Sequence, residues 1–396
     1  AVMKNHQRVW AFAAGILATA VVLAPAAWAA DSAALPVAVE PNSPQIRYVG
    51  RFDWRDAAGP RFEWSGCQIR FRFSGTAVNA LLKDSASGGS HPAGGSRNNY
   101  FNVLIDGGEP KVLALEKGRT VYRLADGLAD GEHTVTLFRR TEPLFGAVQF
   151  MGLQLEAGKS LKPLPPAPKR LIEFIGDSIT CGYGNEGKDP KDPFRQQTEN
   201  NYLAYGAITA RSFGADYVCL AWSGQGVYRD RGEKTDNVLP VLYGRALPSD
   251  RVSKWDPNGY HPDVVVINLC TNDFAKSIPP KDEFLKAYRG LIATIRKHHG
   301  KDVHVFAAVG PMMYDGMPRG QGGGLTAIRG WLTEMAAEYD KAGDKKVHYF
   351  EFDRQDHANG LGSSYHPSLK THRIMAAKLT GAITEKVGWK ATGGRD

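Results

Sequence analysis

The spacing of apolar residues changes near residue 165, and this change divides the chain into two parts. Between Ile46 and Leu155, apolar and polar residues alternate in short runs, as in residues 67–73, 133–137 and 150–155. Successive side chains of a strand point to opposite faces of a sheet, so this period of two predicts half-buried β-strands. About eight short strands at this spacing favour a sandwich or jelly roll.

Turn residues and aromatic residues refine this all-β prediction. Asp106-Gly107-Gly108 and Asp130-Gly131 are typical of hairpin turns, and residues 85–98, rich in Gly and Ser, predict a long loop. Aromatic residues within strands usually belong to the core, but three of them could instead form an exposed surface that stacks on sugars. These three are Trp54, Trp64 and Tyr100.

The second part of the chain shows apolar runs separated by amphipathic stretches. It comes after a proline-rich segment, residues 162–168, which predicts a stiff spacer between domains. The amphipathic pattern is clearest at residues 284–295, where apolar positions recur at helical spacing. The predicted strands are residues 171–175, 217–220, 264–269, 303–308 and 348–352. This alternation predicts a five-stranded parallel sheet in a three-layer α/β/α domain.

The resulting domain organisation begins with a targeting signal. Lys4 and Arg8 precede an apolar run at residues 9–23, and Ala27-Trp28-Ala29 fits a signal-peptidase site. The run is too short for a membrane anchor, which needs about 20 apolar residues. We therefore expect a periplasmic or secreted protein, cleaved near Ala29 or Ala30 and free of the membrane. The expected parts are a signal peptide (1–30), a β-sandwich (31–161), a linker (162–170) and a catalytic domain (171–390).

Composition removes several classes of function. The formal net charge is +8, but the Lys and Arg residues are dispersed. Nucleic acid, which needs clustered basic residues, is therefore not an expected partner. The four cysteines match no zinc spacing, and the histidines match no metal-binding motif, so no metal or other cofactor is expected. Export permits disulfides, but Cys219 and Cys270 end apolar runs, which favours buried thiols over a bridge.

Four short blocks carry candidate chemistry. Ser178 comes directly after the apolar run 171–175 in Gly176-Asp177-Ser178, where open α/β sheets place their ligands, although Ser there is also a common turn or cap residue. Gly224, Asn272 and His366 come from later loops that we expect at the same sheet edge, and each has an ordinary structural interpretation of its own. Together they supply a nucleophile, a backbone N–H, a side-chain amide and an imidazole, the groups that acyl transfer requires.

These blocks resemble the SGNH (GDSL-type) hydrolases. Gly176-Asp177-Ser178-Ile179, Gly224 in Ser-Gly-Gln-Gly, Asn272 in Thr-Asn-Asp and His366 in His-Pro-Ser stand in the order of that family. The longer run from Phe174 to Gly184 is similar to the two-domain family 2 carbohydrate esterases, whose jelly-roll domain precedes the SGNH domain. The resemblance thus covers nearly the whole chain after the signal.

The resemblance implies a fold, a substrate class and residue roles. The fold would be flavodoxin-like, and the activity would be removal of O-acetyl groups from plant cell-wall polysaccharides such as xylan or glucomannan, without a cofactor. Ser178 would be the nucleophile and His366 its base. The oxyanion hole would consist of the backbone N–H groups of Ser178 and Gly224 and the side-chain amide of Asn272.

Two departures and two alternatives accompany this interpretation. Cys270 stands where the family usually has glycine, and Ser363 stands where many members have an aspartate that orients the histidine. We expect a backbone carbonyl in residues 362–364 to orient His366, and neither Asp353 nor Asp356 to do so. The chain could instead deacetylate another polymer, such as peptidoglycan or an exopolysaccharide, or it could be a non-catalytic glycan-binding protein.

Overall fold

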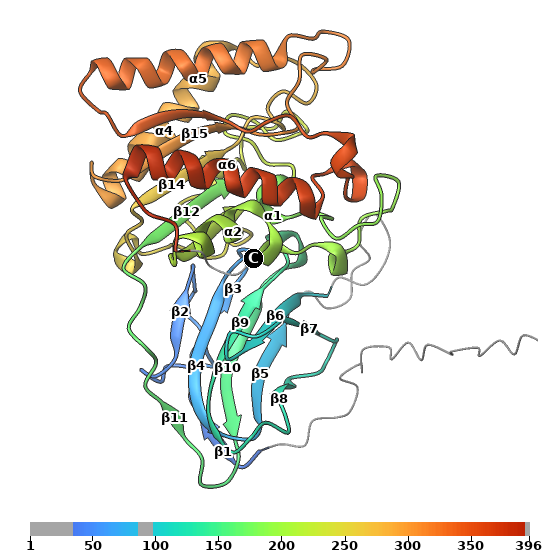
Figure 1. Cartoon of the computed structure of the whole chain (residues 1–396), viewed down its shortest axis with the longest axis vertical. Helices are drawn as coiled ribbons and strands as arrows, with labels where there is room; N and C mark the ends of the chain where they lie inside the picture. The colour runs from blue at the N-terminus through green and yellow to red at the C-terminus, as the bar shows by residue number, and fades with distance from the viewer. Residues whose placement is uncertain (1–34, 86–97, 393–396) are drawn as a thin grey trace, which may run out of the picture. The chain divides into compact units, whose positions relative to one another are not determined.

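The computed structural model describes residues 35–85 and 98–392 of the chain. The predicted signal peptide and most of the predicted 85–98 loop lie outside the described residues. Within them, residues 35–162 form two antiparallel sheets and the residues after the proline-rich segment form an α/β domain (Figure 1). No helix in the described ranges has the length and hydropathy needed to cross a bilayer.

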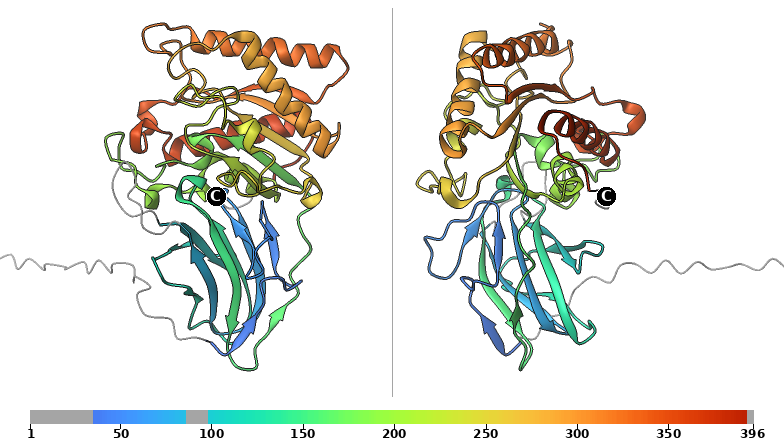
Figure 2. Two further views of the ribbon diagram at one scale, coloured as in Figure 1. Left: turned by 180° about the vertical axis from the view of Figure 1, so that it is seen from behind. Right: turned by 60° about the vertical axis from the view of Figure 1, so that its left-hand side comes forward.

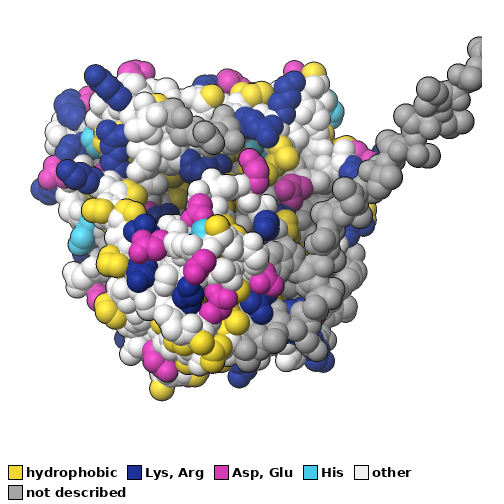
Figure 3. All heavy atoms as spheres, turned by 60° about the horizontal axis from the view of Figure 1, so that its bottom comes forward, with side chains coloured by type: hydrophobic (Ala, Val, Ile, Leu, Met, Phe, Trp, Pro, Cys, Tyr) yellow, Lys and Arg dark blue, Asp and Glu magenta, His cyan; other side chains and the backbone are white. Residues whose placement is uncertain are grey.

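The first part is a two-sheet sandwich, as the alternating pattern predicts. One sheet contains β1 (Val37–Val39), β10 (Val148–Leu155), β5 (Val78–Asp84), β8 (Val121–Ala125) and β3 (Arg61–Phe62). The other contains β11 (Leu161–Lys162), β4 (Gln68–Gly75), β9 (Gly131–Arg139), β6 (Tyr100–Ile105), β7 (Lys111–Ala114) and β2 (Arg47–Val49). Alternate residues of both sheets, such as Phe71 and Leu82, are fully buried in a common core. On the face in Figure 3, Lys and Arg side chains lie among Asp and Glu side chains.

One prediction and one alternative for this part need correction. Asp106-Gly107-Gly108 does join a hairpin, β6 to β7, but Asp130-Gly131 joins strands of different sheets, because β8 pairs with β5 whereas β9 pairs with β4 and β6. For Trp64 the favoured core position is confirmed, and the alternative of a sugar-stacking surface that includes it is wrong. Trp64 is fully buried, and its indole N–H donates to the Arg245 carbonyl of the α/β domain at 3.3 Å. Trp54 is exposed, at 49% of its surface, and Tyr100 is half-buried.

The second part contains the predicted five-stranded parallel sheet. Its strands are β12 (Leu171–Gly176), β13 (Asp216–Ala221), β14 (Val264–Asn268), β15 (His304–Val309) and β16 (Val347–Glu351), in the order β13-β12-β14-β15-β16. The longer helices are α2 (Tyr205–Ser212), α4 (Lys281–His299), α5 (Gly324–Lys341) and α6 (Leu369–Val387). The short ones are α1 (Ser178–Cys181), α3 (Leu239–Leu242), η2 (Gln196–Thr198), η3 (Asn201–Leu203), η4 (Pro257–Gly259), η5 (His357–Asn359) and η6 (Ser363–Tyr365); the sandwich also contains a short helix, η1 (Pro143–Phe145).

The sheet is buried on both faces, which explains why its strands are continuous apolar runs. Val265 and Ile267 of β14 pack in one cluster with apolar residues of α4 and α5. Their neighbours Val264 and Val266 point the other way and pack in a second cluster with residues of α2 and α6. The two helix pairs cover opposite faces of the sheet (Figure 2).

The strand order fixes where a site can form. The chain passes from β12 to β13 on one side and then to β14 on the other side, so the loops after these strands diverge at a topological switch point. Open α/β sheets bind their ligands at the carboxyl ends of the strands at such a point. Ser178 lies directly after β12, Gly224 after β13 and Asn272 after β14.

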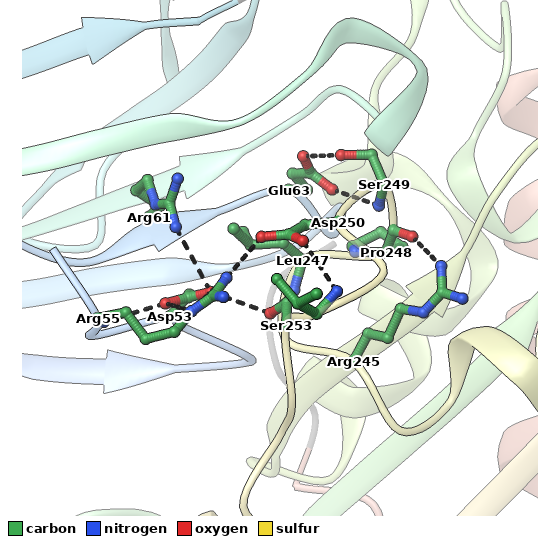
Figure 4. Close-up of polar contacts among 11 residues, drawn as sticks. Asp53, Arg55, Arg61, Glu63, Arg245, Leu247, Pro248, Ser249, Asp250 and Ser253 are labelled. Atoms are coloured by element: carbon green, nitrogen blue, oxygen red, sulfur yellow. Dashed lines mark hydrogen bonds and ion pairs between the residues drawn. The ribbon is translucent and has the colours of Figure 1, made fainter.

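Sandwich and α/β domain belong to one compact unit and share buried polar contacts. The guanidinium of Arg51, from the sandwich, is fully buried, lies 3.8 Å from the centre of the Trp255 ring and forms an ion pair of 3.4 Å with Glu173 on β12. Asp53 accepts a hydrogen bond of 3.0 Å from the Ser253 hydroxyl (Figure 4). The domains are thus joined by an ordered interface in addition to the proline-rich segment.

Candidate active site

Ser178 and His366 meet at the carboxyl end of β12. Ser178 is the first residue of α1, and His366 lies in the loop before α6. The Nε2 atom of His366 is 2.9 Å from the Ser178 Oγ atom. This is the hydrogen-bond distance that a base and a serine nucleophile require.

A backbone carbonyl orients the imidazole, as the sequence predicts. His366 Nδ1 lies 3.2 Å from the Ser364 carbonyl oxygen, which places the proton on Nδ1 and leaves Nε2 free to accept the Ser178 proton. Ser364 and Tyr365 both have positive φ angles, 53° and 65°, a conformation that is rare for two consecutive non-glycine residues. This turn directs the Ser364 carbonyl toward the ring.

The two upstream acids make their polar contacts elsewhere, in agreement with their expected absence from Nδ1. Asp353 pairs with Lys378 at 2.6 Å, and Asp356 accepts a hydrogen bond from the Ala358 N–H at 2.9 Å. Ser363, at the usual acid position, is buried, and its Oγ atom has no hydrogen-bond partner in the described part of the chain. Ser178 and His366 therefore have the geometry of a Ser-His dyad, with Nδ1 facing a neutral acceptor.

Burial keeps His366 in the form that can act as a base. The pKa of His366 is lowered to about 4, chiefly by burial; backbone hydrogen bonds of Ser364 and Ser363 act to raise the pKa, and the positive charge of Arg231 acts to lower it. Tyr183 packs on the imidazole, with 4.4 Å between ring centres, and is itself stacked on Phe194. Neutral imidazole is the form that accepts the nucleophile's proton, so the base is competent at neutral pH.

Asp177 fixes the turn that carries the nucleophile. Its carboxylate caps α1 by accepting the Ile179 N–H at 3.0 Å. Burial raises the pKa of Asp177 to about 7. As the first residue of the helix, Ser178 has a backbone N–H without an intrahelical acceptor, so this N–H can serve an oxyanion.

The loop after β13 presents the Gly224 N–H. Gly224 has φ +82°, a backbone conformation that favours glycine, and its N–H has no acceptor among the described residues. Beyond it, the buried Asp273 carboxylate accepts N–H groups of three successive residues at 2.8–3.1 Å. These are Val227, Tyr228 and Arg229.

Asn272 lies between the nucleophile turn and this loop. Its Nδ2 atom donates to the Gln225 carbonyl at 2.8 Å and to Asp177 Oδ2 at 3.2 Å. Both amide hydrogens thus have protein acceptors. To stabilise an oxyanion, Asn272 has to share one of these hydrogens with it.

One contact of the site was missed from the sequence. Glu142, in the sandwich loop between β9 and β10, is fully buried and accepts hydrogen bonds from the N–H of Ser223 at 2.7 Å and from its hydroxyl at 2.5 Å. Ser223 directly precedes Gly224. An isolated Glu between two strands carries no motif, so only the domain arrangement reveals this contact.

Glu142 also lies beside a second buried carboxyl group. Glu199 accepts the Glu142 N–H at 3.2 Å, and burial raises the pKa of both carboxyl groups. The two carboxyl groups and the Cys181 thiol are the candidate metal ligands in the described ranges, because their possible ligand atoms lie within 4.8 Å of one another. Burial raises the pKa of this thiol as well, which disfavours the deprotonated forms that bind a metal. All four cysteines are buried and unpaired.

Family models match both domains. Residues 48–165 match the model described as carbohydrate esterase 2 N-terminal, and residues 174–374 match the GDSL-like lipase/acylhydrolase family. The second match spans the segment from β12 to α6, which contains all four sequence-predicted site residues.

Individual proteins agree with these matches. A cellulase/esterase, CelE, of Acetivibrio thermocellus is 40% identical over 88% of this chain, although the chain spans only 40% of the length of CelE. An acetylxylan esterase/glucomannan deacetylase of Cellvibrio japonicus is 26% identical over 88% of this chain and 90% of its own length. The structure of a family two carbohydrate esterase from Clostridium thermocellum in complex with cellohexaose is 38% identical, covers 87% of this chain and 99% of that chain, and superimposes with a TM-score of 0.78.

Proposed function

Because this chain belongs to the family 2 carbohydrate esterases within the GDSL-like hydrolases, we propose that it removes O-acetyl groups from plant cell-wall polysaccharides such as xylan and glucomannan. The observation that carries the proposal is the 2.9 Å contact between Ser178 Oγ and His366 Nε2 at the switch point of the sheet. The names of the Cellvibrio relatives support the choice of acetylated xylan and glucomannan.

The geometry supports an acyl-enzyme mechanism. Ser178 Oγ attacks the acetyl carbonyl while His366 Nε2 takes its proton, and the imidazolium that forms donates Nδ1–H to the Ser364 carbonyl. The N–H groups of Ser178 and Gly224, with Asn272, stabilise the negative charge on the carbonyl oxygen. As the bond between the acetyl carbon and the sugar oxygen breaks, His366 gives this proton to that oxygen, and the sugar leaves as an alcohol. Water, deprotonated by the same Nε2, then attacks the acetyl group on Ser178; acetate leaves and the proton returns to Ser178 Oγ.

Substitution of the nucleophile tests this mechanism. We expect Ser178→Ala to abolish hydrolysis of p-nitrophenyl acetate and release of acetate from acetylated xylan and glucomannan, followed by NMR, while the fold stays intact. Residual turnover above about one percent would contradict the role of Ser178, since covalent catalysis supplies several orders of magnitude.

The polymer and the location are tested separately. Acetate release from acetylated peptidoglycan or an exopolysaccharide, with none from xylan or glucomannan, would support the esterase activity but contradict the proposed substrate.

We also propose that the protein is exported, on the basis of the basic and apolar pattern of residues 4–29. N-terminal sequencing of the exported protein should find a first residue near position 30.

A further inference from the structure

Two glutamates of the sandwich bind serines of the α/β domain in the same way. Glu142 accepts both the N–H and the hydroxyl of Ser223. Glu63, in the segment after β3, accepts the N–H of Ser249 at 2.9 Å and also the hydroxyl of Ser249 (Figure 4). Both glutamates are buried. The two contacts differ in one respect: Ser223 directly precedes Gly224 of the proposed oxyanion hole, whereas Ser249 is distant in sequence from the proposed site residues.

Ser249 lies in a loop that makes no described contact with the dyad, whereas Ser223 is bonded to Gly224. The hydrogen bonds to Glu142 hold the backbone N–H and the side chain of Ser223 against one carboxylate. On the far side of Gly224, its carbonyl accepts the Arg231 N–H at 2.8 Å. The segment that presents the Gly224 N–H is thus fixed at both ends, once by Glu142 and once by its own loop.

The position of Glu142 is set by the sandwich. Arg139, buried at the end of β9, donates to the carbonyls of Thr141 at 2.9 Å, Glu142 at 3.3 Å and Gly146 at 2.7 Å. These hydrogen bonds from the guanidinium hold the loop that carries Glu142 in place. The Glu142 carboxylate lies against α1 as well, with the Cys181 thiol at 3.9 Å from Oε2, three residues after the nucleophile.

We propose that Glu142 is a positioning residue for ester hydrolysis, through which the sandwich domain holds the Ser223-Gly224 peptide in the orientation that stabilises the oxyanion. This inference rests on the proposed function, because it takes the Gly224 N–H as an oxyanion donor. Among the described residues, Glu142 forms no hydrogen bond with Ser178 or His366. It acts through Ser223, and its loss releases a donor that otherwise needs no reorganisation in the transition state.

The kinetic test compares the two glutamates. Glu142→Ala should lower kcat for p-nitrophenyl acetate about 10²-fold, the effect of losing one oxyanion donor, and should change KM by less than about threefold. Glu142→Gln should restore kcat to within about tenfold of the wild-type value, because its amide oxygen can accept the Ser223 N–H while its NH₂ donates to the Ser223 hydroxyl. Glu63→Ala is the matched control and should leave kcat within about twofold while lowering Tm.

Two results would overturn the proposal. One is an equal loss of kcat in Glu142→Ala and Glu63→Ala, which would mean that both contacts only stabilise the interface. The other is a rise in KM at constant kcat in Glu142→Ala. If Glu142→Ala does not fold, Glu142→Asp replaces it. This variant keeps the charge but withdraws the carboxylate by one methylene group, and it must lower kcat at unchanged KM.

A second measurement does not depend on turnover. Amide hydrogen exchange of Ser223 should accelerate at least about tenfold in Glu142→Ala and stay unchanged in Glu63→Ala, since the Ser223 N–H loses its acceptor only in the first variant. Unchanged exchange at Ser223 would overturn the inference. If wild-type protein hydrolyses no acetyl ester, the proposed function fails, whereas the exchange result still decides whether Glu142 holds this loop.

Discussion

The two glutamate–serine contacts lie in regions with different charge balance. Around Glu63, Asp53 pairs with Arg55 and Arg61, and Arg55 also pairs with Asp250 at 2.6 Å (Figure 4). Burial acts to raise the pKa of Asp53, but hydrogen bonds from Arg55 and Ser253 outweigh it and leave the pKa below its usual value. We call Asp53, Asp250, Arg55 and Arg61 the compensated region, because both aspartates pair with arginine.

Around Glu142 the acids lack such partners. Within the described residues, neither Glu142 nor Glu199 forms an ion pair, and burial raises the pKa of both. Asp177 and Asp273, on the other side of the oxyanion loop, also have raised pKa values, about 7 and about 6. Buried acids with raised pKa values cluster at functional sites. One end of the domain interface therefore serves stability, and the other holds the catalytic loops.

Removing the sandwich eliminates both regions at once and should have the largest effect. We expect an equal loss of activity on polysaccharide and on a small ester. Deletion up to Pro163 would leave Glu173 without the buried charge of Arg51 and the Ser223 N–H without Glu142. We expect a chain that does not fold cooperatively and shows no turnover of either substrate. Circular dichroism and p-nitrophenyl acetate hydrolysis measure this.

A folded truncated chain that retains aryl acetate activity would contradict this expectation. It would show that the compensated region is dispensable and that the sandwich contributes only to polysaccharide binding.

Asn272 tests the side-chain donor of the proposed oxyanion hole. Asn272→Ala removes a donor that also links Asp177 to the Gln225 carbonyl, so kcat should fall roughly 10²–10³-fold with little change in KM. Steady-state kinetics on p-nitrophenyl acetate measure the split. A rise in KM at constant kcat would make Asn272 a substrate-binding residue. Combined with Glu142→Ala, a less than additive loss would show that both side chains act on one loop.

The sequence predicted those features that repeat locally. The five strands, the helix at 284–295 and the loops with Ser178, Gly224, Asn272 and His366 all follow from periodicity and short motifs. The connection at Asp130-Gly131 was predicted wrongly, because a turn motif does not determine with which strand each of its neighbouring strands pairs. The contacts of Trp64 and Glu142 with the α/β domain were missed for a common reason. Their roles depend on a second domain, and a residue's own neighbours in sequence carry no signal of a partner more than 80 residues away.

On acidification, activity that depends on neutral His366 should be lost at a higher pH than the stability contributed by the compensated region. The pKa of His366 is lowered to about 4, so kcat/KM should hold through pH 6.5 and fall with a midpoint near 4. Asp53 and Asp250 have lowered pKa values, so the stability they contribute is present above their unfolded-state pKa near 3.8 and is lost as pH falls through their folded-state pKa. Circular dichroism at pH 5 should therefore show an intact fold.

A midpoint near 6.5 would mean that His366 titrates as an ordinary exposed histidine. An inflection near pH 7 could instead come from Asp177, and Asp177→Asn would remove it without moving the limb near pH 4.

The smallest effects should come from the acids nearest to His366 in the sequence. Asp353 is exposed and pairs with Lys378, and Asp356 caps a short 3-10 helix. Nδ1 of His366 already has the Ser364 carbonyl as its acceptor at 3.2 Å. Asp353→Asn and Asp356→Asn should therefore each lower kcat by less than about tenfold, whereas loss of a carboxylate that truly orients a catalytic histidine costs about 10⁴. His366→Ala is the matched control and should abolish turnover. A thousandfold loss in either Asp variant, with normal folding, would require a loop rearrangement during catalysis that brings this carboxylate to Nδ1 and turns the dyad into a triad.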